Sequence, residues 1–203
     1  MRYTGPKARK ARRQGMNLFG SDKYDKILQK KPYGPGKGPK SQTGKRSEYA
    51  VQLLEKQKAR DMYGLNEQQF QRVYREATQV AGQTGDALKQ LLERRLDNVV
   101  YRAGLAMTRI QARQFVGHGL FTVDGVRVTV PSFRVKPGQV IQVRTQTKDS
   151  PIFAQIHTAH EKYNAPSWLV TDGSKITVKD LPAAEHGEQA IDVRKIVEFY
   201  SRN

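Results

Sequence analysis

The chain has 203 residues and a formal net charge of +17, which results from 36 lysines and arginines against 19 aspartates and glutamates. Its length allows one or two domains with a buried core, and so strong a positive charge points to a polyanionic partner such as nucleic acid. The sequence contains no cysteine, which excludes disulfides, thiolate metal sites and cysteine nucleophiles.

The sequence lacks the apolar segments of membrane and exported proteins. No apolar run approaches the roughly 20 residues that a membrane-spanning helix needs, so we expect a soluble protein. Residues 1–13 are basic, but no apolar stretch of about 7–15 residues follows them, as a secretory signal would require. These observations predict a cytoplasmic protein that has no contact with a membrane.

Residues 1–46 carry most of the excess charge. They hold 14 lysines and arginines but only Asp22 and Asp25 as acids, and they include a stretch rich in proline and glycine at 32–39. Such a segment has too few large apolar side chains to offset its ordering entropy. We therefore expect an arm that is disordered in the free protein and becomes ordered on a polyanion.

Two polar-rich helices are predicted after the arm. Ser47 is a suitable N-cap for a helix that runs to about Tyr63, where a glycine ends it. Asn66 and Gln69 form a cap-like start for a second helix, which runs to about residue 81.

The clearest helical pattern runs from Thr84 to Gly104 as a single element. Leucines, valines and alanines recur there three or four residues apart and therefore share one stripe. Thr108 and Gln111 then fit a capping box, which begins a short helix to about Val116.

The period changes to two after Gly119. Residues 120–123 and 126–130 flank Asp124-Gly125, a dipeptide that favours a hairpin turn because both positions need positive φ. The valines of the second strand alternate with Arg127 and Thr129, which predicts one apolar and one polar face. A further strand is predicted at 139–143. From Thr145 the patterns are weaker, and they predict a helix at 152–162, a hairpin of 168–171 with 175–178, and a final element at 193–200.

Several separated motifs resemble known RNA-binding proteins. The alpha-L RNA-binding motif is similar to residues 95–102, 108–114, 118–119 and 123–125. The flanking segments extend this resemblance to the family of bacterial small-subunit ribosomal protein four, which is similar to the chain at residues 2–6, 45–50, 55–60 and 196–201. The resemblance covers nearly the whole chain in order.

The resemblance implies an α+β fold in three parts. These are a basic extended N-terminal arm (1–46), a mainly helical body domain (47–93 and 145–203), and an alpha-L RNA-binding domain (94–144) with two helices packed on a small antiparallel sheet. Many relatives bind zinc through an N-terminal cysteine cluster. This chain resembles the zinc-free branch, so we expect no metal and no cofactor.

The resemblance also implies a function. It predicts a structural constituent of the small ribosomal subunit, not an enzyme. Such a protein is a primary binder of 16S rRNA that nucleates assembly of the subunit body and contributes to translational accuracy. The expected partners are small-subunit rRNA, ribosomal protein five and other small-subunit proteins, with binding to messenger RNA left open.

Arg109 and Arg113 are the clearest candidates for phosphate contacts. They lie four residues apart on one helix face, and Arg109 lies in the first turn, where backbone amides and the helix dipole favour an anion. The family fold brings Arg127, Arg134 and Lys136 toward the same groove. The full set of predicted RNA-binding residues is Arg2, Tyr3, Lys7, Arg9, Lys10, Arg12, Arg13, Lys45, Arg46, Lys58, Arg95, Arg109, Gln111, Arg113, His118, Arg127, Ser132, Arg134 and Lys136.

Some of these residues also have a simpler interpretation. Gln111, Ser132 and His118 can donate to phosphate or 2′-hydroxyl oxygens, but His118 between two glycines equally suits a turn. Tyr3 can stack on a base or be an ordinary loop residue.

Other residue patterns raise alternatives that we consider weaker. Asp97 has the chemistry of a catalytic acid, but with Arg94 and Arg102 nearby it is better explained as an ion-pair partner that orients arginines. His157, His160 and Glu161 have a spacing that suits a metal, but two imidazoles without a convincing third ligand are a weak signal.

Two other classes of function compete with the ribosomal one. The alpha-L motif is also appended to pseudouridine synthases and tyrosyl-tRNA synthetases, but residues 34–41 do not meet the phosphate-loop pattern and no triad-like set is present. A factor that binds nucleic acid away from the ribosome is the third possibility, and sedimentation with small subunits separates it from the first.

Overall fold

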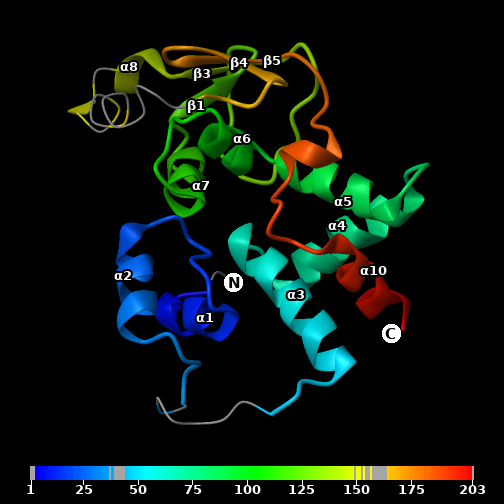
Figure 1. The fold of residues 1–203 in the computed structure, drawn as a ribbon. Helices are drawn as coiled ribbons and strands as arrows, with labels where there is room; N and C mark the ends of the chain where they lie inside the picture. The colour runs from blue at the N-terminus through cyan, green and yellow to red at the C-terminus, as the bar shows by residue number, and fades with distance from the viewer. Residues whose placement is uncertain are drawn as a thin grey trace. The chain divides into compact units, whose positions relative to one another are not determined.

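The computed structural model describes residues 3–36, 38, 44–148, 150, 151, 153, 156 and 164–202. The chain divides into two compact units (Figure 1). Unit 1 comprises residues 1–88 and 188–203, and unit 2 comprises residues 89–187. Within the described ranges, no helix has both the length and the apolar character needed to cross a membrane.

Unit 1 is helical. Its elements are α1 (Lys7–Gln14), α2 (Asp22–Lys30), α3 (Glu48–Met62), α4 (Glu67–Gln79), the first half of α5 (Thr84–Glu93) and α10 (Val193–Ser201). The predicted caps are confirmed: the Ser47 side chain accepts from the Ala50 amide, and Asn66 and Gln69 form a reciprocal capping box. Helix α10 packs against α3, and Phe70 and Ile196 are fully buried in this unit.

The N-terminal arm is not extended throughout, because it contains helices α1 and α2. Ala11 of α1 is fully buried and Leu18 is 3% exposed. The side chain of Gln14 donates to the Leu54 carbonyl of α3 at 2.9 Å, and Lys10 pairs with Asp61. Asp61, an acid of α3, thus neutralises part of the positive charge of the arm. Disorder of the free arm stays a prediction.

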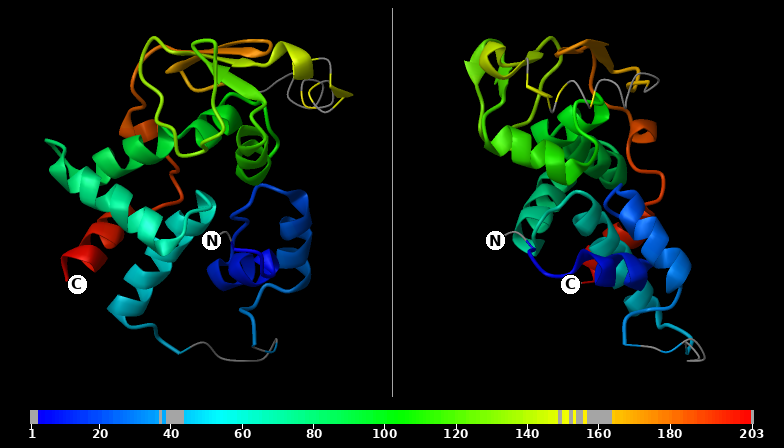
Figure 2. Two further views of the ribbon diagram at one scale, coloured as in Figure 1. Left: turned by 180° about the vertical axis from the view of Figure 1, so that it is seen from behind. Right: turned by 90° about the vertical axis from the view of Figure 1, so that its left-hand side faces the viewer.

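Unit 2 is a five-stranded antiparallel sheet with helices. After the second half of α5, its elements are α6 (Leu96–Arg102), α7 (Arg109–Gly117), β1 (Phe121–Val123), β2 (Val126–Arg127), β3 (Val140–Val143), α8 (Thr145–Lys148), β4 (Leu169–Asp172), β5 (Lys175–Val178) and the 3-10 helix η1 (Ala184–His186). The strand order is β2-β1-β3-β5-β4. Figures 1 and 2 show α6 and α7 on one face of this sheet, where Val99, Phe121 and Ile141 share one buried core. The α+β fold class is therefore confirmed.

The single helix predicted from Thr84 to Gly104 is wrong, because two helices form with a break at residues 94–95. The amide of Leu96 donates to the Phe133 carbonyl at 2.8 Å instead of to a helical partner. The amide of Val135 donates to the Arg94 carbonyl at 3.0 Å. Backbone pairing with a distant segment therefore replaces the helical hydrogen bonds at this point.

The hairpin at Asp124-Gly125 is confirmed, since both residues have positive φ. The second strand, however, is only the two-residue β2. Val126 and Val130 are 68% and 53% exposed, whereas Val128 between them is partly buried against the core of unit 2. The predicted apolar face of residues 126–130 is therefore only partly buried.

The second predicted hairpin is also confirmed, with β4 paired to β5 across its whole length. Strand β5 pairs in turn with β3, for example Ile141 with Ile176. These strands lie within residues 145–203 yet belong to the sheet of unit 2, so the boundary predicted at residue 144 falls inside that unit. Most of the helix predicted at 152–162 lies outside the described residues.

Candidate nucleic-acid interface

Helix α7 carries the two arginines that the sequence identifies most strongly. The Thr108 hydroxyl accepts from the Gln111 amide at 3.2 Å, and the Gln111 side chain accepts from the Met107 amide at 2.7 Å. The Thr108 cap is therefore confirmed, although the Gln111 side chain accepts from the Met107 amide and not from the Thr108 amide as in a capping box. It fixes the start of the helix and places Arg109 in the first turn.

Arg109 is held from two sides. Its Nε donates to Oδ1 of Asn98 at 2.8 Å, and its guanidinium lies over the Tyr101 ring at 4.5 Å from the centroid. The cation–π contact and the hydrogen bond together limit the directions in which the half-buried Arg109 side chain can point.

Arg113 and Arg95 share one carboxylate, that of Asp97. Arg95 makes two hydrogen bonds to it, at 3.1 and 2.8 Å, and Arg113 approaches it at 3.3 Å. Arg95 is only 5% exposed and Asp97 only 4%. Of the predicted RNA-binding residues in unit 2, Arg95 therefore presents little surface, whereas Arg113 is half-buried.

The ion-pair role predicted for Asp97 is confirmed, but the predicted partners are wrong. Arg102 pairs with Glu93 instead, and Arg94 donates to the Val135 carbonyl at 3.1 Å. The break between α5 and α6 removes the helical spacing between Arg94 and Asp97. Asp97 and Arg102 lie five residues apart within α6, a spacing that does not make them neighbours on one helix face.

Arg127 lies against the end of α7. Its Nη2 donates to the His118 carbonyl at 3.2 Å, and a Cβ on Gly119 would come within 2.3 Å of Arg127 Nε. Gly119 also has a φ of +70°. Glycine is favoured here by the backbone conformation, which L side chains rarely adopt, whereas the Arg127 guanidinium is the end of an exposed, flexible side chain. The His118 side chain is exposed at this helix end, as both of its interpretations allow.

Sequence reasoning missed Arg144, which follows β3. Its Nη1 donates to the Gly119 carbonyl at 3.4 Å, and it also contacts the Gln146 side chain. Arg144 thus joins Arg127 at the C-terminal end of α7, where the helix dipole favours cations. No local pattern marks this residue, because only the folding of β3 beside β1 brings it there.

Sequence reasoning also missed Arg94 as part of the cationic surface. Burial and the neighbouring charge of Arg134 both lower the pKa of Arg94 from its usual value. The backbones of Arg95 and Arg134 form an isolated antiparallel bridge, which brings these positive charges together. Repulsion of this kind is relieved when an anion binds. The predicted residues Ser132 and Lys136 nearby are exposed.

The predicted residues of unit 1 differ in how far they reach solvent. Arg9, Arg13, Lys45 and Arg46 are exposed, and Lys7 is half-buried. Lys58 donates to Glu55 and to the Ala190 carbonyl. Arg2 lies outside the described residues.

Lys10 and Arg12 of α1 make contacts that bear on their availability. Lys10 pairs with Asp61 at 2.6 Å and lies 3.8 Å from the centroid of the exposed Tyr3 ring. Arg12 donates to the carbonyls of Tyr33 and Gly34.

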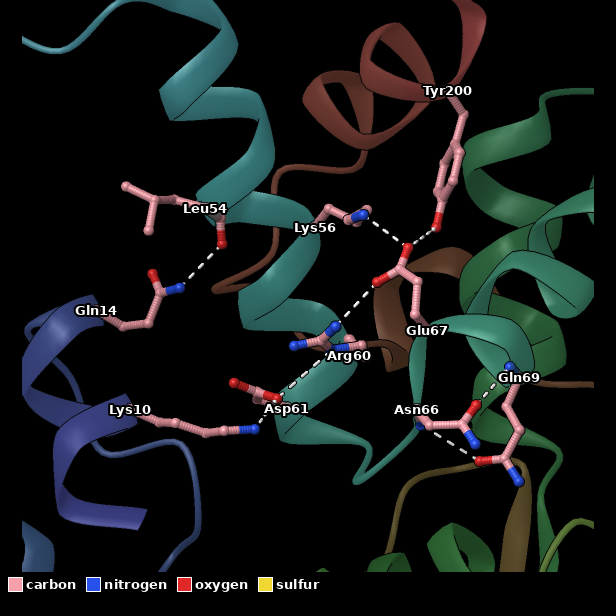
Figure 3. A network of polar contacts seen from close by, with 10 residues as sticks. All are labelled: Lys10, Gln14, Leu54, Lys56, Arg60, Asp61, Asn66, Glu67, Gln69 and Tyr200. Atoms are coloured by element: carbon pink, nitrogen blue, oxygen red, sulfur yellow. Dashed lines mark hydrogen bonds and ion pairs between the residues drawn. The ribbon is translucent and has the colours of Figure 1, made fainter. Parts of the chain in front are cut away.

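A polar network stabilises unit 1 beside these cations (Figure 3). The Glu67 carboxylate accepts from Lys56 at 2.6 Å, from Arg60 at 2.9 Å and from the Tyr200 hydroxyl at 3.1 Å. Burial acts to raise the pKa of Glu67, but these three partners together hold it below its usual value. Burial and the charge of Glu67 raise the pKa of Tyr200, so its hydroxyl stays protonated and donates.

No group of three or more metal-ligating side chains is present in the part of the chain that the structure describes. The weak candidates His157, His160 and Glu161 lie outside the described residues.

Comparisons with known proteins identify the family. Residues 2–93 match the model of the ribosomal protein S4/S9 N-terminal domain, and residues 94–141 match that of the S4 domain. The chain is 47% identical to small ribosomal subunit protein uS4 of Cutibacterium acnes, 46% to that of Halalkalibacterium halodurans and 48% to that of Geobacillus sp., in each case over 99% of both chains. The chain therefore belongs to the uS4 family of small ribosomal subunit proteins.

Proposed function

We propose that this chain is a structural constituent of the small ribosomal subunit that binds 16S rRNA, and that it has no enzymatic activity. The observation that carries the proposal is the end-to-end similarity to relatives named as small ribosomal subunit proteins. The net charge of +17 supports it, because phosphate contacts by lysine and arginine provide most of the affinity for RNA.

The arginines of unit 2 form the proposed centre of the interface. Arg109 and Arg113 extend from α7, Arg127 and Arg144 lie at its C-terminal end, and Arg134 belongs to the segment beside the helix break. Buried acceptors orient several of these guanidiniums, so their positions are fixed before RNA arrives. The exposed cations of the arm would add contacts along the RNA backbone.

The finer parts of the function are proposals that follow from family membership. They are nucleation of the subunit body, a contribution to translational accuracy, contact with ribosomal protein five and other small-subunit proteins, binding to messenger RNA, a place on cytoplasmic ribosomes, and membership of the zinc-free branch. The absence of cysteine from the sequence supports the last of these.

The three-part domain organisation is also a proposal. The two family models meet between residues 93 and 94, which supports a boundary there. The pairing of β5 with β3 favours including residues 145–187 with the RNA-binding domain.

Co-sedimentation tests the function directly. Tagged protein should sediment with small subunits through a sucrose cushion at moderate salt and should bind a 16S rRNA transcript in the absence of other proteins. Protein that remains in the supernatant while still binding unrelated nucleic acid would support a factor that acts away from the ribosome instead.

A further inference from the structure

Buried polar side chains connect the helix break to the RNA-binding face. Glu93 is fully buried and Asn98 is 2% exposed. Arg102 makes two hydrogen bonds to the Glu93 carboxylate, at 2.9 and 3.0 Å. The Asn98 Nδ2 donates to the same carboxylate at 2.7 Å and to the Glu93 backbone carbonyl at 3.2 Å. Asn98 is thus fixed from the interior of unit 2.

The orientation of the Asn98 amide follows from these contacts. Because Nδ2 faces the Glu93 carboxylate, Oδ1 is available to accept from Arg109 Nε, at 2.8 Å. A flipped amide would place a donor against Arg109 and an acceptor against Glu93, which are both unfavourable. The hydrogen bonds therefore select one orientation, and that orientation presents an acceptor to Arg109.

We propose that Asn98, oriented by Glu93, is a positioning residue that holds the Arg109 guanidinium ready for an rRNA phosphate. This inference rests on the proposed function, since it assumes that Arg109 contacts RNA. A long side chain loses rotamer freedom when it binds, and one that is already held loses less. Removal of Asn98 should therefore weaken rRNA binding although it removes no positive charge.

A double-mutant cycle on the full chain, with a full-length bacterial 16S rRNA transcript as the probe, tests the inference. Asn98→Ala should weaken binding by about three- to tenfold in the wild-type background. In the Arg109→Ala background the same change should have no further effect, because the side chain that Asn98 positions is absent.

Asn66→Ala is the matched control. It removes the N-cap of α4, and therefore lowers thermal stability, but Asn66 lies in unit 1 and makes none of the contacts described for Arg109. Its rRNA affinity should equal that of the wild type. This comparison separates a loss of positioning from a general loss of stability.

A second measurement needs no substitution and covers the case in which Asn98→Ala fails to fold. In ¹⁵N-labelled wild-type protein free of RNA, the Arg109 Nε proton should exchange slowly with solvent because Asn98 accepts it. Rapid exchange of that proton would overturn the inference.

The cycle distinguishes failure of the inference from failure of the proposed function. Unchanged affinity of the Asn98→Ala variant, or an equal loss in both backgrounds, would overturn the positioning role while leaving rRNA binding intact. If the wild-type chain itself does not bind the transcript, the proposed function is wrong and the inference fails with it.

Discussion

Arg109 and Arg113 contact different acceptors, and this makes them suitable for a paired substitution. Asp97 keeps its two hydrogen bonds from Arg95 when Arg113 is removed, so the buried carboxylate is not left unpaired. Arg109→Ala with Arg113→Ala should lower rRNA affinity by about 1–3 kcal/mol for each charge-assisted bond lost. The slope of log K against log salt should become shallower by roughly 0.7–0.9 per lost contact.

The control for this pair is Arg72→Ala with Arg75→Ala. Both residues are exposed on α4, and the double change removes the same number of charges. Filter-binding titrations over a range of salt should show the larger effect for the α7 pair. Equal effects of the two double variants would mean that only total charge matters.

Glu67 gives the stability of unit 1 a dependence on pH. Its pKa is held below the usual value of 4.5, so its contribution to stability is present above that value and is lost as pH falls through the folded-state pKa. Glu67→Gln removes the titrating group. The free energy of unfolding, measured by urea titration, should therefore fall less steeply below about pH 4.5 in this variant than in the wild type.

Glu48→Gln provides the comparison, because the Glu48 carboxylate is 70% exposed in its ion pair with Arg202 and is screened by solvent. Its acid unfolding should follow that of the wild type. If both variants flatten the pH dependence equally, the network around Glu67 has no special role.

At the scale of the element, two glycines lie at the C-terminal end of α7, and we expect only Gly119 to be needed for stability. Gly119→Ala places a Cβ against the Arg127 guanidinium in a backbone of φ +70°. We expect it to destabilise the protein by roughly 1–3 kcal/mol. Gly117→Ala, two residues earlier, meets nothing within 4 Å and should be neutral or stabilising by about 0.5–1 kcal/mol. Denaturant midpoints measure both, and a neutral Gly119→Ala would contradict the strain expected for a side chain at this positive φ.

Element starts and turns were predictable from the sequence because their determinants are local. Ser47, Asn66 and Thr108 cap the helices that they were expected to cap, and the turn at residues 124–125 forms. The break between α5 and α6 was not predictable in this way. The backbone groups at the break form hydrogen bonds with residues 131–135, which are distant in the sequence. The apolar stripe continues across the break, so the sequence pattern is that of one uninterrupted helix.

The candidate interface shows the same division. The helical spacing of Arg109 and Arg113 is a property of the sequence, whereas Arg94 and Arg144 become part of the cationic surface only through tertiary contacts. The positioning role of Asn98 could not be predicted from the sequence. A buried, hydrogen-bonded asparagine and a solvent-exposed one look the same in a helical sequence, and only the structure shows the hydrogen-bond partners.

At the scale of the whole molecule, the arm combines helices with few apolar anchors. The contacts of α1 with α3 described above are polar, and each contributes about 0.5–1.5 kcal/mol, whereas ordering costs roughly 1–2 kcal/mol of backbone entropy per residue. Hydrogen exchange should therefore show weak protection over residues 1–46 in the free protein and strong protection on 16S rRNA. Strong protection without RNA would mean that the arm is a stable part of unit 1.

Deletion of the arm extends this prediction. A chain lacking residues 1–46 should keep a thermal transition close to that of the full chain, with lower rRNA affinity and a weaker dependence of that affinity on salt. A large fall in the transition temperature would instead show that Ala11 and Leu18, both buried, are needed for the core of unit 1.

Unit 1 is assembled from two stretches of chain that are made at different times. Gln52 of α3 donates to Glu198 of α10, which follows it by 146 residues. At a synthesis rate of about 5–20 residues per second, roughly 7–30 s pass before α10 exists. During that interval the surface of α3 that α10 covers is open to solvent, while the strands from β1 (Phe121–Val123) to β5 (Lys175–Val178) are being made. A nascent chain paused before α10 would therefore expose this surface of α3 to chaperones and to aggregation.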